Sequence, residues 1–261
     1  HQRTESTLIG NEQGRSQAIQ NTEKLYPDNS IVVHFSCDSA FFKQSAHYKK
    51  ELKQASNFKK AFQNIINTSC NFPFTALEKK GTVKKEVIED IHNILEHIHS
   101  CYFSSKTSLS CIERQVFQLI GYAYLQEYLC IKLEPDSYSS NCKDSIDRSM
   151  IINAIRYFLY LRRNNLANNP AEFQKFRILI HSPAWLVKEQ PIVKSRRELL
   201  LAFMDLMEKI PMSQNEEMDY FKVPHSIVVE TEKGPIRKKI TPLKSFSQSE
   251  EKVQEFASAC F

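Results

Sequence analysis

Glycine is scarce in this sequence: only 5 of the 261 residues are glycine, against a usual share of about 7%. This scarcity excludes collagen-like repeats and glycine-rich linkers, and it argues against an all-β fold built on tight turns. The chain also lacks any apolar run near the roughly 18 residues of a membrane span. We therefore expect a protein that is soluble or peripheral to a membrane. Hydrophobic residues make up 41% of the chain, which is enough for one sizeable core.

Paired metal-ligand or disulfide spacings are also missing. The seven cysteines are odd in number and form no C-x-x-C pair, so we expect reduced thiols in a cytosolic setting. His92, His97 and His99 precede Cys101, but the histidines lack i,i+4 spacing and no second ligand pair accompanies them. The sequence therefore predicts no metal site. The net charge of +5 suits an anionic partner but does not point to nucleic acid.

The hydrophobic pattern predicts a helix-rich α/β domain. Short β-branched or apolar runs at Ile31–Phe35 and Leu129–Leu133 are read as strands of a small sheet. Residues 70–81 read as a loop. Helical periodicity marks residues 40–65, 82–102, 110–125, 150–161, 171–180 and 197–210. Ser110 and Glu113 have the spacing of a capping box at the start of the third of these helices, and Arg162 and Arg163 are expected to form a charged tip at the end of the fourth. The predicted organisation is a polar N-terminal arm over 1–30, a catalytic domain over 31–210, and a hairpin with a C-terminal tail over 211–261, packed on the same domain.

The segment that carries chemistry begins at Cys142, which is followed by Arg148 after five intervening residues. A loop of this length can curl so that its backbone N–H groups point inward and hold a phosphate dianion. A helix that starts directly after the loop adds the positive end of its dipole. This field favours thiolate over thiol, which would make Cys142 a nucleophile at neutral pH. The guanidinium group of Arg148 can then grip two phosphate oxygens.

The spacing alone is a weak signal, because chance gives about 0.3 such Cys–Arg pairs in a chain of this composition. Its context is more specific. An apolar stretch, Met150–Leu161, predicts a central core helix at the place where a phosphate loop needs a helix N-terminus. Ser149 follows the arginine, where a hydroxyl can hydrogen-bond a thiolate. None of the other six cysteines has an arginine six positions on.

The string Asn141-Cys142-x-Asp144-x-Ile146-Asp147-Arg148-Ser149 resembles the Sac-domain phosphoinositide phosphatase motif N-C-x-D-x-L-D-R-T. Its C-x-D-x-x-D-R core is also similar to that of myotubularin. The full C-K-D-S-I-D-R string most resembles the bacterial effector phosphoinositide phosphatases of the SidF and SidP kind. The resemblance covers about ten residues. Because those effectors are longer than this chain, we expect it to be a catalytic fragment.

The resemblance implies a domain similar to the cysteine phosphatase fold and hydrolysis of an inositol-ring phosphate, expected to be the 3-phosphate, on polyphosphorylated phosphatidylinositols of a membrane. Cys142 would attack phosphorus and form a phosphocysteine, while Arg148 would bind the phosphate and its transition state. A general acid must protonate the leaving inositol oxygen; Asp144 is the first candidate and Asp147 the second. The remaining substrate-binding residues would be Lys143, which suits a second ring phosphate, and Ser145, Ile146 and Ser149. No metal or cofactor is required.

Basic residues in the C-terminal region predict a contact with an anionic membrane. A hairpin is expected between Val223 and Ile240, turning at Lys233-Gly234-Pro235 and carrying Arg237, Lys238 and Lys239. Lysine and arginine near an anionic leaflet are each worth about 1 kcal/mol of attraction. We expect a monomer that binds phosphoinositide lipids and, if it is a secreted effector, acts in the host cytoplasm and on endomembrane surfaces.

Two other functions are compatible with the sequence. A protein tyrosine or dual-specificity phosphatase would use the same loop chemistry, although Lys143, Asp144 and Asp147 make this loop more charged than is usual for that class. A catalytically inactive helical interaction module would account for the amphipathic helices and the polar arm. It predicts no phosphate release, and partner binding that is unaffected by Cys142→Ser.

Overall fold

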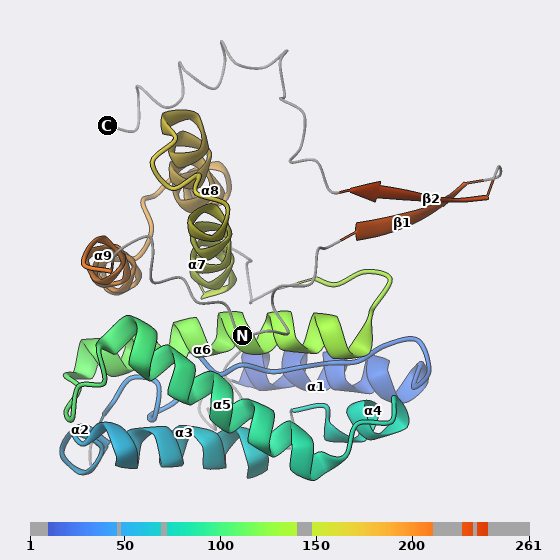
Figure 1. Ribbon diagram of the computed structural model, residues 1–261, viewed down its shortest axis with the longest axis horizontal. Helices are drawn as coiled ribbons and strands as arrows, with labels where there is room; N and C mark the ends of the chain where they lie inside the picture. The colour runs from blue at the N-terminus through green and yellow to red at the C-terminus, as the bar shows by residue number, and fades with distance from the viewer. Residues whose placement is uncertain are drawn as a thin grey trace. The chain divides into compact units, whose positions relative to one another are not determined.

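The computed structural model describes residues 10–45, 48–68, 72–139 and 148–210, and the backbone of 226–231 and 234–239. The chain divides into two compact units, His1–Met218 and Asp219–Phe261. The first unit contains α1 (Gly10–Leu25), α2 (Tyr48–Glu51), α3 (Ala55–Thr68), α4 (Phe74–Lys79), α5 (Lys84–Phe103), α6 (Cys111–Leu133), α7 (Arg148–Arg163), α8 (Pro170–Lys188) and α9 (Lys194–Glu208) (Figure 1). The second contains β1 (Ser226–Thr231) and β2 (Gly234–Lys239).

The prediction of an α/β domain with a small sheet is wrong. The elements described in the first unit are all helices, with one isolated bridge between Gln54 and Ser108. The segment Ile31–Phe35 forms no strand, and the Phe35 ring lies 4.8 Å from that of Tyr122. Leu129–Leu133 forms the last turns of α6. A short apolar run suits a buried helix as well as a strand, and here burial in a helical core decides.

Helix α6 is the centre of the first unit. Most of its residues are buried, and it packs against α5 on one side and against α7 and α9 elsewhere. Gly121 allows α3 to come close, because a Cβ at this position would lie 2.8 Å from the Phe62 ring. The Phe62 ring in turn packs edge-on against Tyr122 at 5.5 Å. The core is therefore aromatic where α3 crosses α6.

The capping box predicted at the start of α6 is confirmed. The Ser110 hydroxyl accepts a hydrogen bond from the backbone N–H of Glu113 at 3.3 Å, and the Glu113 carboxylate accepts one from the backbone N–H of Ser110 at 2.7 Å. Two of the backbone donors that every helix N-terminus leaves unpaired are satisfied in this way. The local sequence alone is enough to place this boundary.

Other helix boundaries differ from prediction. The helix expected over 40–65 is broken between α2 and α3, where the backbone of Lys53 and Ala55 hydrogen-bonds with that of Leu109 and Thr107. The expected loop over 70–81 contains α4, the polar arm over 1–30 contains α1, and α8 continues eight residues beyond 180, through Pro183. At the break between α2 and α3, backbone hydrogen bonds with a distant segment override the helical periodicity of the local sequence.

The prediction of a central helix after the phosphate-loop motif is confirmed by α7. Its buried face includes Met150, Ile151, Ile152 and Ile155, and it packs against α6, α8 and α9. Figure 1 shows α7 set against α6, with α8 and α9 beside it. The first residue of α7 is Arg148, the arginine of the motif.

The second unit contains the expected hairpin. Strands β1 and β2 pair antiparallel, with Ser226 opposite Lys239 and Thr231 opposite Gly234. Gly234 and Pro235 therefore lie inside β2, whereas the sequence placed them in the turn. Of the predicted membrane-facing residues, Arg237 and Lys238 pair with Val228 and Ile227. Among the described residues of the whole chain, no helix is both long and apolar enough to cross a bilayer.

Candidate anion-binding site

Two of the predicted motif residues, Arg148 and Ser149, lie in the described part of the chain. Both open α7, and both are buried: 7% of Arg148 and 1% of Ser149 is exposed. The other predicted site residues of the motif lie outside the described residues; they are Cys142, Lys143, Asp144, Ser145, Ile146 and Asp147. The described part of the site is the set of residues around Arg148.

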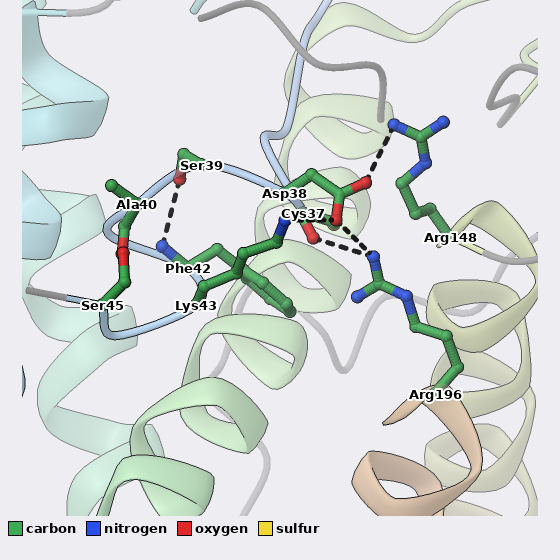
Figure 2. A network of polar contacts seen from close by, with 9 residues as sticks. All are labelled: Cys37, Asp38, Ser39, Ala40, Phe42, Lys43, Ser45, Arg148 and Arg196. Carbon is green, nitrogen blue, oxygen red and sulfur yellow. Dashed lines mark hydrogen bonds and ion pairs between the residues drawn. The ribbon is translucent and has the colours of Figure 1, made fainter. Parts of the chain in front are cut away.

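Arg148 is held by Asp38, a residue that the sequence analysis did not single out. Nη1 of Arg148 lies 3.1 Å from Oδ2 of Asp38. The other carboxylate oxygen, Oδ1, accepts a hydrogen bond from Nη2 of Arg196 at 2.8 Å. Figure 2 shows the Asp38 carboxylate between the two guanidinium groups, which reach it from α7 and from α9. One carboxylate therefore joins three segments that are far apart in the sequence.

The turn that carries Asp38 is fixed by its own polar contacts. The backbone N–H of Phe42 donates to the Ser39 hydroxyl at 3.0 Å. Arg196 adds two contacts to the same turn, because its Nη2 donates to the Cys37 carbonyl at 3.1 Å and its guanidinium group lies 5.7 Å from the centre of the Phe42 ring (Figure 2). The position of the Asp38 carboxylate is thus set by backbone as well as by side-chain contacts.

Three cations approach the carboxylate of Asp38. Lys43 also approaches Asp38, with its Nζ 3.6 Å from Oδ1, so three cations surround one carboxylate. The side chains of Arg148, Arg196 and Asp38 are 8%, 12% and 12% exposed, so water screens them poorly. Arginine does not lose its proton in proteins. Guanidinium groups can hold carboxylate or phosphate oxygens through paired N–H donors, and in this cluster both guanidinium groups contact the Asp38 carboxylate.

Cys37 lies beside the same cluster but is not a nucleophile. Its thiol is buried, and burial raises its pKa to about 12 even though Arg196 and Arg148 act in the opposite direction. At neutral pH the sulfur is therefore protonated, and a thiol is a far weaker nucleophile than a thiolate. A cysteine nucleophile for this site has to come from elsewhere in the chain.

Arg196 could have been found from the sequence. The buried apolar residues of α9 are Leu199, Leu200, Phe203 and Met207, and Arg196 precedes them at the i+3, i+4 and i+7 spacings that share one helix face. Arg196 was not among the residues predicted for the site. Its neighbour Arg197 is exposed, as a residue one position off that face should be. Asp38 has no comparable local signal.

Two further expectations from charge patterns are resolved by contacts. Arg162 and Arg163 were read as the charged tip of a helix. Arg162 is instead buried and donates to the carbonyls of Met207 and Ile210, and Arg163 pairs with Glu127 at 2.6 Å.

His99, from the histidine group that precedes Cys101, also has a structural partner. One of its ring nitrogens lies 2.8 Å from the Lys106 carbonyl, and the other lies 3.2 Å from Lys59 Nζ. No group of three or more His, Cys, Asp or Glu side chains suited to a metal ion occurs in the part of the chain that the structure describes.

The chain matches no protein-family model, no curated protein and no solved structure. A functional interpretation therefore depends on the residues and contacts of this chain itself.

Proposed function

We propose that this protein is a cysteine-dependent phosphatase that removes a phosphate from the inositol ring of phosphoinositides. The observation that carries the proposal is the nine-residue string Asn141–Ser149, whose arginine is the first residue of α7. The helical fold differs from the cysteine phosphatase fold that the resemblance implied. The proposal therefore depends on the motif and its immediate surroundings, not on the fold.

The reaction proceeds in two steps. In the first, the Cys142 thiolate attacks phosphorus, the bond between phosphorus and the inositol oxygen breaks, and Asp144 or Asp147 gives that oxygen a proton. In the second, water attacks phosphorus, the sulfur–phosphorus bond breaks, and one proton of the water passes to the carboxylate that acted as the acid. This step releases inorganic phosphate and restores both the thiolate and the acid. Arg148 binds the phosphate oxygens throughout and stabilises the charge that develops on them. No redox partner enters either step.

The surroundings of Arg148 support this chemistry. Helix α7 has 16 residues and begins at Arg148, so the positive end of its dipole faces the motif. Arg148 is held by Asp38, and Arg196 is bound to the same carboxylate. These contacts place two guanidinium groups beside residue 148, where the proposed loop ends. Positive charge at that position favours both a bound phosphate and a thiolate.

The direct test is phosphate release from vesicles that carry each mono- and polyphosphorylated phosphatidylinositol. The expected result is release from at least one lipid, which Cys142→Ser abolishes and Arg148→Lys lowers by about 100-fold or more. The matched controls are Cys130→Ser and Arg197→Lys, which remove a half-buried thiol and an exposed guanidinium and should leave the rate within about twofold. Release that survives Cys142→Ser would overturn the mechanism.

A pH–rate profile separates the two candidate acids. The true acid has to be protonated in the free enzyme, so its loss removes the decline of kcat/KM on the alkaline side of the profile. Asp144→Asn is expected to flatten that side, whereas Asp147→Asn is expected to lower the rate without changing the shape. The opposite pattern would make Asp147 the acid, and an unchanged shape in both variants would exclude both residues.

The helical architecture of the first unit favours one alternative, a catalytically inactive interaction module. This function predicts no phosphate release from any lipid or from phosphotyrosine peptides. Including phosphotyrosine peptides in the panel also tests the protein tyrosine phosphatase alternative, for which peptide turnover should exceed lipid turnover.

A further inference from the structure

We propose that Cys101 and His97 form a second reactive site, a thiol nucleophile and its base, at which a small-molecule disulfide such as glutathione disulfide modifies the protein. Both residues belong to α5, not to the motif at Asn141–Ser149. The inference goes beyond the proposed function and does not depend on it.

The two side chains lie one turn apart on the same helix. His97 and Cys101 have the i,i+4 spacing that stacks side chains on one face, and Nδ1 of His97 is 3.6 Å from Sγ of Cys101. A neutral imidazole has one ring nitrogen that accepts a hydrogen bond. Because the sulfur is within hydrogen-bond reach of Nδ1, the imidazole can take the thiol proton directly.

The imidazole of His97 is oriented by a further contact. Its ring centre lies 5.8 Å from that of Tyr124, and the two ring planes are inclined by 47°. Tyr124 belongs to α6 and is itself fixed, because its hydroxyl group is 2.6 Å from that of Tyr102 in the buried core. A nucleophile, a base within reach of it and a group that orients the base are the parts of an activated nucleophile.

Both members of the pair are partly exposed. Cys101 and His97 are half-buried, and they flank the buried face of α5 that includes Ile94, Ile98 and Tyr102. A thiol has to be both activated and accessible in order to react. Their position at the edge of the buried face meets the second condition, and the contact with Nδ1 meets the first.

Three other described cysteines lack this combination. Burial raises the pKa of the Cys37 thiol to about 12 and also raises that of Cys130. The Cys111 sulfur accepts a hydrogen bond from Nη2 of Arg114 at 3.3 Å, but arginine cannot act as a proton acceptor. Cys130 is half-buried like Cys101, so it serves as the reference thiol for the experiment.

The reaction is a thiol–disulfide exchange. The Cys101 sulfur attacks one sulfur of the added disulfide while Nδ1 of His97 takes the thiol proton. A new S–S bond forms at Cys101, the S–S bond of the added disulfide breaks, and the leaving thiolate receives the proton from the His97 imidazolium. Cys101 is thereby oxidised to a mixed disulfide, and the added disulfide is reduced to one bound and one free half. An excess of thiol reverses the exchange.

The test incubates the full chain with glutathione disulfide at pH 7 and follows each cysteine-containing peptide by mass spectrometry. Cys101 should gain glutathione about tenfold faster than Cys130 or more, and His97→Gln should lower the Cys101 rate by about tenfold or more. The matched control is His92→Gln. His92 is an exposed histidine of the same helix that contacts Gln63, and its replacement should leave the Cys101 rate within about twofold.

A second variant covers the case in which His97→Gln does not fold. His97→Phe keeps a ring beside Tyr124 but has no proton acceptor, so it should lower the Cys101 rate in the same way. In urea, where the pair is separated, Cys101 should react equally fast in the wild type and in the variants. A Cys101 rate no higher than that of Cys130, or one that both His97 variants leave unchanged in the folded protein, would overturn the inference. None of these measurements involves phosphate release, so their outcome is independent of the proposed function.

Discussion

Cys37 shows how burial outweighs neighbouring positive charge at a single thiol. Two arginines lie near it, yet the pKa of its thiol is raised to about 12 because the sulfur is fully enclosed. Burial also raises the pKa of Cys130. A reactive cysteine needs the opposite combination, positive charge with access to solvent. The proposed phosphate loop would give Cys142 that combination.

Alkylation with iodoacetamide across pH 5–9 tests this difference. We expect Cys142 to react at a rate that is nearly constant above about pH 7, because a thiolate stabilised by a phosphate loop is already formed there. Cys37 should stay unmodified in the folded protein and react only after denaturant is added. The measurement is the modified fraction of each cysteine-containing peptide by mass spectrometry. Added inositol phosphate should slow the reaction of Cys142 alone.

Cys130 serves as the internal reference in this experiment. The alkylation rate of Cys130 should rise about tenfold per pH unit up to its pKa, because a thiol whose pKa is ordinary or raised is mostly protonated over this range. If the alkylation rate of Cys142 rises with pH in parallel with that of Cys130, the Cys142 sulfur is an ordinary thiol. Its assignment as the nucleophile of the proposed mechanism would then be wrong.

Three arginines show which properties of a single residue could be inferred from the sequence and which could not. The role proposed for Arg148 comes from its spacing to Cys142. The burial of Arg196 follows from its place on the apolar face of α9, although the sequence analysis did not use that signal. The burial of Arg162 depends on the carbonyls of Met207 and Ile210, about 45 residues away. A partner at that separation leaves no trace in the local pattern.

Helices were predicted well where the signal was local. The capping box of α6 and the apolar face of α7 both depend on residues within one or two turns, and both are confirmed. The strands at Ile31–Phe35 and Leu129–Leu133 were wrong because a short apolar run does not determine its own secondary structure. The break between α2 and α3 arises from backbone pairing with residues 107–109, which no property of the segment itself reveals.

The capping box gives a pH-dependent prediction for α6. Burial raises the pKa of Glu113, but hydrogen bonds from Lys106 and Ser110 outweigh it, and the net pKa is lowered. A carboxyl group whose pKa is lower in the folded state stabilises the fold above its unfolded pKa of about 4.5. That contribution is lost as pH falls through the folded-state pKa. Glu113→Gln should therefore destabilise the protein at pH 7 and should cost less at pH 3.

Urea unfolding of the wild type and of Glu113→Gln at both pH values measures this effect. The expected loss at pH 7 is about 1 kcal/mol, typical of a helix cap. Glu198→Gln is a suitable control, since that carboxylate is more exposed and its Lys194 contact is long, at 4.0 Å. An equal loss for Glu113→Gln at pH 7 and pH 3 would show that the charge of the carboxylate contributes nothing.

At the scale of the whole molecule, the candidate site is assembled from distant parts of the chain. Asp38, Arg148 and Arg196 meet only because α7 and α9 pack together beside the turn at Asp38. The sequence supplied one of these three residues as a site residue, through a contiguous motif. A motif of consecutive residues can be recognised in the sequence, whereas a cluster that packing brings together can be recognised only in the structure.

Membrane attraction is the last property that belongs to the whole chain. The net charge is +5, and β2 of the second unit contains three consecutive basic residues, Arg237, Lys238 and Lys239. Each basic residue near an anionic leaflet contributes about 1 kcal/mol, and salt screens the attraction. Replacing all three with serine should weaken binding to vesicles that contain anionic lipid about 100-fold. Turnover of a soluble inositol phosphate should not change.

A second triple variant separates local from overall charge. Lys79, Lys80 and Lys85 are exposed on and after α4 and at the start of α5, and their replacement with serine lowers the net charge by the same amount, from +5 to +2. Cosedimentation with vesicles at 50 and 300 mM salt should show a large loss for the β2 variant and a small one for this control. Equal losses would mean that the membrane responds to net charge alone, and that β2 has no particular role in binding it.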